Sequence, residues 1–203
     1  GDVVSETNAT ASIGGTDTVY SYLAAYTLGT NVENLRLLAT GTANGTGNSL
    51  NNLIYAGAGN NILNGDAGTD TVSYAYASSA VSVSLSSSAA QATGGSGSDT
   101  LLNIANLTGS KYNDKLIGNS AANSLNGGSG ADRMIGGNGN DIYYVDNTGD
   151  IVSERGHVSV LRLSDGTAEC AYAVAEAVES SLLDNIVAQS RVARSETEHA
   201  RAK

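Results

Sequence analysis

The sequence lacks proline, phenylalanine and tryptophan, and it holds one cysteine and one methionine among 203 residues. The single Cys170 cannot form an internal disulfide. No apolar run approaches the roughly 20 residues that a membrane-spanning helix needs. Because only 40% of the residues are hydrophobic, the chain cannot easily build a thick globular core. It could build a thin core that is stacked one layer at a time.

Basic side chains are also scarce. Residues 1–154 carry 13 acidic and 4 basic side chains, whereas residues 155–203 carry 7 and 6. Strong acidity argues against nucleic acid or an anionic membrane as a partner, because both reward clustered Lys and Arg. Acidity instead suits a cation binder, although ordinary solubility would explain it too. The change in composition predicts a boundary near residues 154–156.

Known catalytic constellations are missing. The sequence contains no His-Glu-x-x-His and no Gly-x-Ser-x-Gly, and both histidines, His157 and His199, lie after the boundary. Asp66 and Asp70 could be paired carboxylates for glycoside hydrolysis, but a role in a turn explains their spacing better. We therefore predict that this chain is not itself an enzyme.

Glycine is abundant, at 25 residues, and much of it follows a nine-residue frame. The frame runs four times without a gap over residues 109–144, and it opens with Gly, has Asp or Asn at position 6 and a large side chain at position 8. A shorter array occupies residues 47–73, and an isolated frame occupies residues 94–102. The expected organisation is a flanking β segment, the first array, connecting strands with the isolated frame, the second array and a tail, at residues 1–46, 47–73, 74–108, 109–154 and 155–203.

A short period of this kind predicts a solenoid. Six residues of each frame can form a turn and three a strand, whose central residue at position 8 points inward because side chains alternate along a strand. Two frames then make one coil of about 18 residues. The predicted fold is an all-β parallel solenoid, or β-roll, with a narrow apolar interior that contains Leu116, Leu125, Met134 and Tyr143. No frame can bury its side chain alone, so the coils must form together.

The turns offer the chemistry of a hard cation. Calcium takes six to eight oxygens from carboxylates and backbone carbonyls, and glycine lets the backbone adopt the left-handed conformations that aim carbonyls inward. Alternate turns fall on the same edge, which predicts that Asp114, Asp132 and Asp150 share one edge and that Asn123 meets Asp141 on the other. Stacked carboxylates repel unless a cation lies between them, so we expect the array to need metal for its order.

Residues 127–135 (GGSGADRMI) and 136–144 (GGNGNDIYY) resemble, position for position, the nonapeptide of the repeats-in-toxin (RTX) family. This resemblance implies a parallel β-roll that binds calcium (Ca²⁺) at both edges. It also implies a bacterial protein exported by type I secretion, as are certain proteases, lipases, polysaccharide epimerases, cytolysins and adhesins. The likeness covers roughly residues 1–154.

The resemblance assigns calcium first to Asp132 and Asp141 and to their turns, which contain Gly127, Gly128, Gly130, Gly136, Gly137, Gly139 and Asn140. Asp70 and Asp99 follow, and Asp114, Asp150 and Asn123 complete the candidate set. Several frames depart from the family pattern, with Leu50, Tyr112 and Ala121 at position 4 in place of Gly and Asn52, Asn61 and Asn123 at position 6 in place of Asp. We expect more than one ion, but fewer than one for each frame.

The tail is different in kind. Residues 168–188 are rich in helix formers and predict one amphipathic helix, which belongs either to an export signal or to a foreign end. Residues 1–6 nearly recur at residues 149–154, which suggests a piece of a larger tandem polypeptide. The prediction is a secreted, extracellular or cell-surface calcium-binding module that folds on meeting calcium. The alternatives are the C-terminal part of an exported enzyme, or an adhesin repeat. Beyond calcium, a polysaccharide or the rest of a parent chain is a candidate partner.

Overall fold

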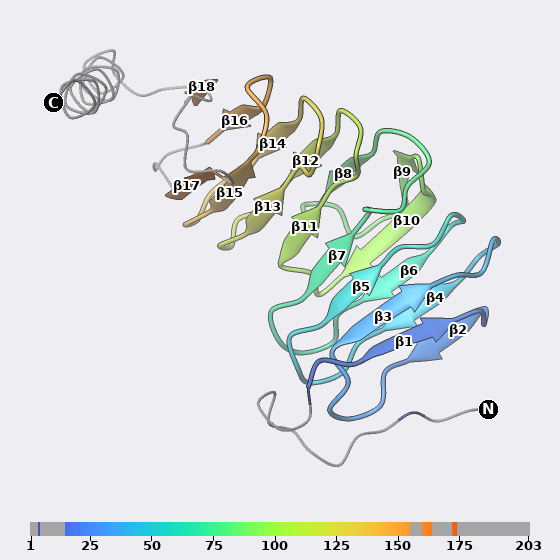
Figure 1. Cartoon of the computed structure of the whole chain (residues 1–203). Coiled ribbons are helices and arrows are strands. Elements are labelled where there is room, and N and C mark those ends of the chain that lie inside the picture. Colours follow the sequence, from blue (N-terminus) through green and yellow to red (C-terminus); the bar gives the residue numbers. More distant parts are fainter. Residues whose placement is uncertain (1–3, 5–14, 155–159, 164–171, 174–203) are drawn as a thin grey trace, which may run out of the picture.

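The computed structural model describes residues 4, 15–154, 160–163 and 172–173. Short strands stack one above another into a β-solenoid of about eight coils, with a long sheet along one face and two shorter sheets along the other (Figure 1). Within the described residues, all the solenoid pairings are parallel, and the one antiparallel strand pair is β9 with β10. The predicted all-β parallel solenoid is therefore confirmed.

The long sheet has the strand order β1-β3-β5-β7-β11-β13-β15-β17. Its strands are Thr18–Ser21, Asn34–Leu37, Leu53–Tyr55, Thr71–Ser73, Asn106–Thr108, Ser124–Asn126, Ile142–Val145 and Val160–Leu163.

On the opposite face, the N-terminal short sheet has the order β2-β4-β6-β10-β9 and the C-terminal short sheet the order β18-β16-β14-β12-β8. The first comprises Ala25–Thr27 (β2), Asn44–Thr46 (β4), Ile62–Asn64 (β6), Gly97–Leu102 (β10) and Gln91–Gly94 (β9). The second comprises Tyr172–Ala173 (β18), Ile151–Ser153 (β16), Arg133–Ile135 (β14), Lys115–Ile117 (β12) and Ser82–Ser84 (β8).

In the arrays, the centre of the core is a column of buried side chains on each face, built from position 8 of the frame. In the long sheet, Leu107, Leu125 and Tyr143 pair in register. In the C-terminal short sheet, Leu116 pairs with Met134. All of these side chains are buried, and Leu116, Leu125 and Met134 have no exposed surface. Burying one such side chain contributes about 1.5–3 kcal/mol, so the strand period follows directly from the sequence.

The repeat is interrupted once, between β7 and β11. These strands are neighbours in the long sheet, yet the chain between them places three strands, β8, β9 and β10, on the opposite face, where every other coil has one. Two additional strands lengthen that face by about 10 Å. The stack accordingly changes direction at this junction (Figure 1).

The isolated frame at residues 94–102 behaves as a repeat only in part. Leu101 is buried and pairs with Leu63, as position 8 requires. Its first residues, however, form the tight connection between the antiparallel strands β9 and β10 rather than a six-residue solenoid turn. Sequence reasoning could not separate these roles, because glycine serves both kinds of turn.

Residues 31–35 (NVENL) and 103–107 (NIANL) resemble each other in sequence and also in backbone conformation. Asn31 and Asn103 both adopt left-handed backbone conformations, with φ of 64° and 53°. Each comes just before a strand of the long sheet, β3 or β11, whose leucine is buried.

In the tail, Tyr172–Ala173 form β18 within the segment expected to be a helix. The rest of residues 168–188 lies outside the described residues. Among the residues described, no helix could cross a membrane.

Candidate metal centres in the solenoid turns

Turns on the same edge are joined through position 6. The backbone N–H of this position donates to the Oδ1 atom of the Asp one coil further along, 18 residues later. The bonds run from Asn52 to Asp70 (2.7 Å), Asp114 to Asp132 (2.7 Å), Asn123 to Asp141 (2.8 Å) and Asp132 to Asp150 (2.9 Å). The structure thus brings Asp114, Asp132 and Asp150 together on one edge, and Asn123 and Asp141 on the other.

Five turns, which we call closed, satisfy a side-chain oxygen of position 6 within the turn. In each, the N–H of position 2 donates to the side-chain oxygen of position 6. The pairs are Asn48 with Asn52, Gly57 with Asn61, Ser110 with Asp114, Asn119 with Asn123, and Asp146 with Asp150. Neither position 2 nor position 4 of these turns has a positive φ. Their position-6 side chains therefore stabilise the turn through a hydrogen bond within it.

Three turns, which we call open, are built differently: residues 65–70, 127–132 and 136–141. Both position 2 and position 4 are left-handed, with φ of 70° and 119° at Asp66 and Gly68, 80° and 134° at Gly128 and Gly130, and 106° and 119° at Gly137 and Gly139. This rotation turns the position-2 N–H away from position 6. In the first two turns that N–H donates instead to the side chain of Asn64 or Asn126.

The open geometry leaves carboxylate oxygens without protein donors. Oδ2 of Asp70 and Oδ2 of Asp132 are buried and have no hydrogen-bond partner. The exposed fractions of these two side chains are 0% and 1%. A buried acceptor without a donor is costly, and a buried negative charge costs more. A positively charged neighbour would therefore stabilise each of these oxygens.

Glycine is required in the open turns because backbone carbonyls pass close by. A Cβ on Gly128 would lie 2.3 Å from the carbonyl oxygen of Ser110, and one on Gly130 would lie 2.5 Å from that of Tyr112. Gly137 and Gly139 face the carbonyls of Asn119 and Ala121 at 2.3 and 2.6 Å in the same way. Each open turn thus packs against carbonyl oxygens of the closed turn one coil before it.

The electrostatics of the open turns agree with their hydrogen bonding. Burial raises the pKa of Asp132 to about 7, and the negative charges of Asp114, Asp150 and Asp146 add to the increase. Burial likewise raises the pKa of Asp70, with a smaller contribution from Asp66. Burial also raises the pKa of Asp141, while hydrogen bonds from Asn123 and with Glu154 oppose the change. All three carboxylates would be stabilised by a nearby cation.

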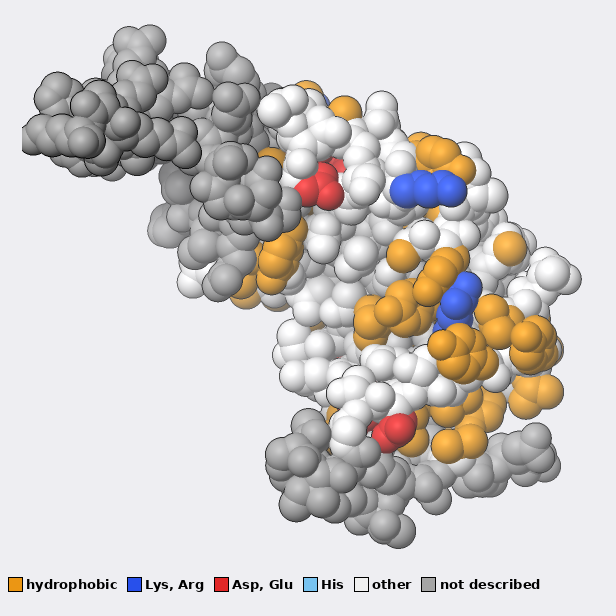
Figure 2. Space-filling model, in the orientation of Figure 1, with side chains coloured by type: hydrophobic (Ala, Val, Ile, Leu, Met, Phe, Trp, Pro, Cys, Tyr) orange, Lys and Arg blue, Asp and Glu red, His pale blue; other side chains and the backbone are white. Residues whose placement is uncertain are grey.

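These residues fit a calcium ion. Among the described residues, no group of three or more His, Cys, Asp or Glu side chains gathers to hold a metal. A site in the turns must therefore combine a carboxylate with backbone carbonyls, which is the ligand set that calcium accepts. Acidic side chains are correspondingly sparse on the face seen in Figure 2, because Asp70, Asp114, Asp132, Asp141 and Asp150 are buried inside the turns.

The remaining candidates occupy other environments. Asp114, Asp150 and Asn123 belong to closed turns, and Asn140 lies exposed in an open one. Asp99 sits on β10, where Oδ1 accepts from the Asn61 N–H at 2.8 Å and Oδ2 from the Thr93 hydroxyl at 3.2 Å. Burial raises the pKa of Asp99 to about 6 despite these bonds. Gly127 and Gly136 occupy position 1 of their turns and lie beside Asp132 and Asp141.

One signal in the sequence separates open from closed turns. The three open turns are the solenoid turns that have both Gly at position 4 and Asp at position 6, namely Gly68 with Asp70, Gly130 with Asp132, and Gly139 with Asp141. The turn at residues 56–61 has the glycine but Asn61, and the turn at residues 109–114 has the Asp but Tyr112. These three carboxylates, together with Asp99, are also the ones that the resemblance to the RTX nonapeptide placed first.

The comparison with protein families agrees with this geometry. The model of the RTX calcium-binding nonapeptide repeat matches the chain in four copies, over residues 46–74 and 108–143. These ranges contain all three open turns and most of both arrays. A search among curated proteins gives no match.

Proposed function

We propose that this chain, which belongs through its repeats to the RTX calcium-binding nonapeptide family, is a secreted module that orders its solenoid on binding extracellular calcium. The observation that carries the proposal is the open turn at residues 127–132. There Oδ2 of Asp132 is buried without a donor, and neighbouring carboxylates oppose its ionisation.

Three oxygen sources would hold an ion at this turn: the Asp132 carboxylate and the carbonyls of Ser110 and Tyr112, which lie against Gly128 and Gly130. Asp141 with the carbonyls of Asn119 and Ala121 offers the same set on the other edge. Calcium would supply the positive charge that these stacked carboxylates lack. The chain itself supplies the glycines that bring the carbonyls close and the N–H groups that fix each Oδ1.

Secretion would make this chemistry a switch. Extracellular modules bind calcium with dissociation constants of roughly 10⁻⁴–10⁻³ M, whereas the cytosol holds far too little calcium to fill such sites. A chain whose carboxylates repel one another would stay loose before export and become ordered afterwards. Proteins with RTX repeats are typically secreted by bacteria, which supports this location. The proposal assigns the module no catalytic step.

Circular dichroism and calorimetry test the proposal together. The full chain is titrated with calcium in a chelator-treated buffer, with magnesium at the same concentration as the control. We expect strand signal and heat of binding to rise together in the millimolar range with calcium and much less with magnesium, whose strict octahedral geometry suits these flexible turns poorly. Full strand signal in chelator, or no calcium-specific heat, would refute the proposal.

A further inference from the structure

At the junction between the two arrays, a carbonyl from outside the repeats takes the place that a repeat turn of the next coil fills elsewhere. On the edge that carries the turn at residues 65–70, the next link is not a six-residue turn but the three-residue connector Asn103–Ala105 between β10 and β11. The connector wraps over Asp70, whose backbone carbonyl accepts the N–H groups of Ala105 (3.0 Å) and Asn106 (2.9 Å). The left-handed Asn103 directs its own carbonyl back toward the open turn.

Two oxygens lie close together beside Gly65. The carbonyl oxygen of Asn103 and Oδ2 of Asp70 are each 2.4 Å from the point that a Cβ on Gly65 would occupy. Both atoms are hydrogen-bond acceptors, and Oδ2 is buried without a donor. The same pairing of a carbonyl with a position-6 oxygen occurs beside the first glycine of three closed turns, Gly47, Gly109 and Gly118, but there the N–H of position 2 donates to the position-6 oxygen. Of these four glycines, only Gly65 lies beside a position-6 oxygen without a donor.

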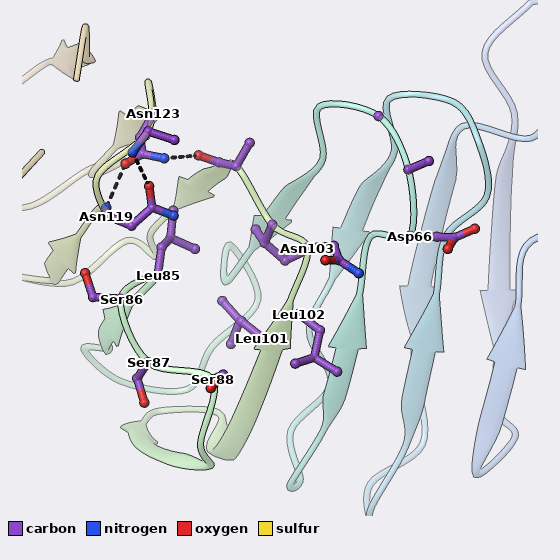
Figure 3. A pocket seen from close by; sticks show the side chains of 15 residues that line it. Asp66, Leu85, Ser86, Ser87, Ser88, Leu101, Leu102, Asn103, Asn119 and Asn123 are labelled. Atoms are coloured by element: carbon purple, nitrogen blue, oxygen red, sulfur yellow. Dashed lines mark hydrogen bonds between the residues drawn. The ribbon is translucent and has the colours of Figure 1, made fainter. Parts of the chain in front are cut away.

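The connector also reaches the second array. The carbonyl of Ala105 accepts the side-chain amide of Asn123 at 2.8 Å, so hydrogen bonds run from the Asp70 carbonyl through Ala105 to a closed turn of that array. Beside the connector, a cavity of about 660 Å³ separates the turns that would otherwise stack on this edge (Figure 3). The connector therefore bridges the two arrays where their turns do not meet.

Asp66 is not a member of the converging pair. Its carboxylate points away from Asn103 (Figure 3), and its side chain is exposed. Its charge nonetheless acts on Asp70, since it contributes to the raised pKa of that carboxyl. Asp66 thus adds to the negative potential of the site without competing for the space between the two oxygens.

We propose that a calcium ion held between Asp70 and the Asn103 carbonyl fixes the joint between the two arrays. This inference rests on the proposed function and extends it, because the ion would join a repeat turn to a connector from outside the repeat. With the ion, the carboxylate and the carbonyl are drawn together and the connector is clamped. Without it, the two oxygens repel and the arrays move relative to each other.

Spin-label distance measurements on the full chain test this joint. Labels are placed at exposed Ser49 in the first array and exposed Ser120 in the second, with Cys170→Ser to leave only the engineered thiols. In the otherwise unaltered chain we expect a narrow distance distribution in calcium and a broad one in chelator. A distribution that is the same in both conditions would overturn the inference without any variant at the site.

Two matched variants locate the effect. Asp70→Asn should bind one calcium ion fewer and stay broad in calcium, whereas Asp132→Asn should also lose one ion but keep the calcium-dependent narrowing. Asn is compatible with position 6, because Asn52, Asn61 and Asn123 occupy it in closed turns. If Asp132→Asn loses an ion and Asp70→Asn loses none, the joint is refuted while the proposed function stands. If the unaltered chain binds no calcium, both fail.

Discussion

Replacing Asp132 with Asn should change the stability of the fold in opposite directions with and without calcium. In the folded chain the pKa of Asp132 rises from 3.8 to about 7. Between these two values the folded chain binds more protons than the unfolded chain, so the stability of the metal-free fold falls as pH rises through that window. Above pH 7 Asp132 is ionised in the metal-free fold, so its buried negative charge then lowers the free energy of unfolding by the full amount.

The size of the effect follows from the shift. One pKa unit corresponds to about 1.4 kcal/mol, so the ionised carboxylate costs at most about 4 kcal/mol, and relaxation of the turn would reduce this to about 2–4 kcal/mol. In chelator at pH 8, Asp132→Asn should therefore be more stable than the unaltered chain. Calcium at 100 times the dissociation constant adds about 2.7 kcal/mol for each site. Asp132→Asn should lack this stabilisation at one site, so in calcium its advantage in stability over the unaltered chain should shrink or become a disadvantage.

Circular dichroism at pH 8 measures both quantities: the residual strand signal in chelator reports the folded fraction of the metal-free chain, and urea denaturation in calcium reports the stability of the calcium-bound fold. Asp17→Asn is the matched control, because Asp17 is exposed and lies outside the turns that hold the position-6 carboxylates. It should change stability by less than about 0.5 kcal/mol in both conditions. The reasoning fails if Asp132→Asn is the less stable protein in chelator, or if calcium stabilises it as much as it stabilises the unaltered chain.

Three further predictions concern protons, packing and backbone. Calcium affinity at Asp132 should weaken about tenfold per pH unit below pH 7, since the ion competes with the proton; calorimetry at pH 8 and pH 6 tests this, and a pH-independent affinity contradicts it. Leu125→Ala should lower the free energy of unfolding by about 2–5 kcal/mol, because Leu125 has no exposed surface. Lys115→Ala on the outer face should change it by less than about 0.5 kcal/mol. Similar losses of stability for both variants in thermal unfolding would argue against a column-like core. Gly130→Ala should destabilise the second array and abolish its calcium response, because φ is 134° and the new Cβ would meet the Tyr112 carbonyl at 2.5 Å. Gly41→Ala is the neutral control, because a Cβ there would have no atom within 4 Å. Equal calcium responses of the two variants would count against the open-turn geometry.

Much of the fold could be predicted because the sequence is periodic. Leu116, Leu125, Met134 and Tyr143 recur every nine residues, and a three-residue strand can bury only its central side chain. The frame therefore determined the strands, the parallel stacking and the pairing of turns 18 residues apart. The same period alone places Asp132 between Asp114 and Asp150.

The sites could be predicted only in outline. Asp114, Asp132 and Asp150 share position 6 of the frame, and only Asp132 among them has an oxygen without a donor. The sequence marks Asp132 by Gly130 at position 4, but it does not say how that glycine changes the hydrogen bonds. The difference arises from backbone rotation at positions 2 and 4, which decides whether an N–H points toward the carboxylate. Gly57 shows that glycine alone does not impose this rotation, because its turn is closed.

By itself, the sequence determined the solenoid, its apolar column and the acidic, glycine-rich chemistry of its edges, since these depend on local spacing that repeats. Only the tertiary structure decided which oxygens of Asp70 and Asp132 keep no donor and how the arrays meet, because both depend on residues that lie far apart in the chain. Asp70 and Asn103 are separated by the strands β8, β9 and β10, and no period relates them. Their oxygens come together because those additional strands bend the stack and a three-residue connector replaces a turn.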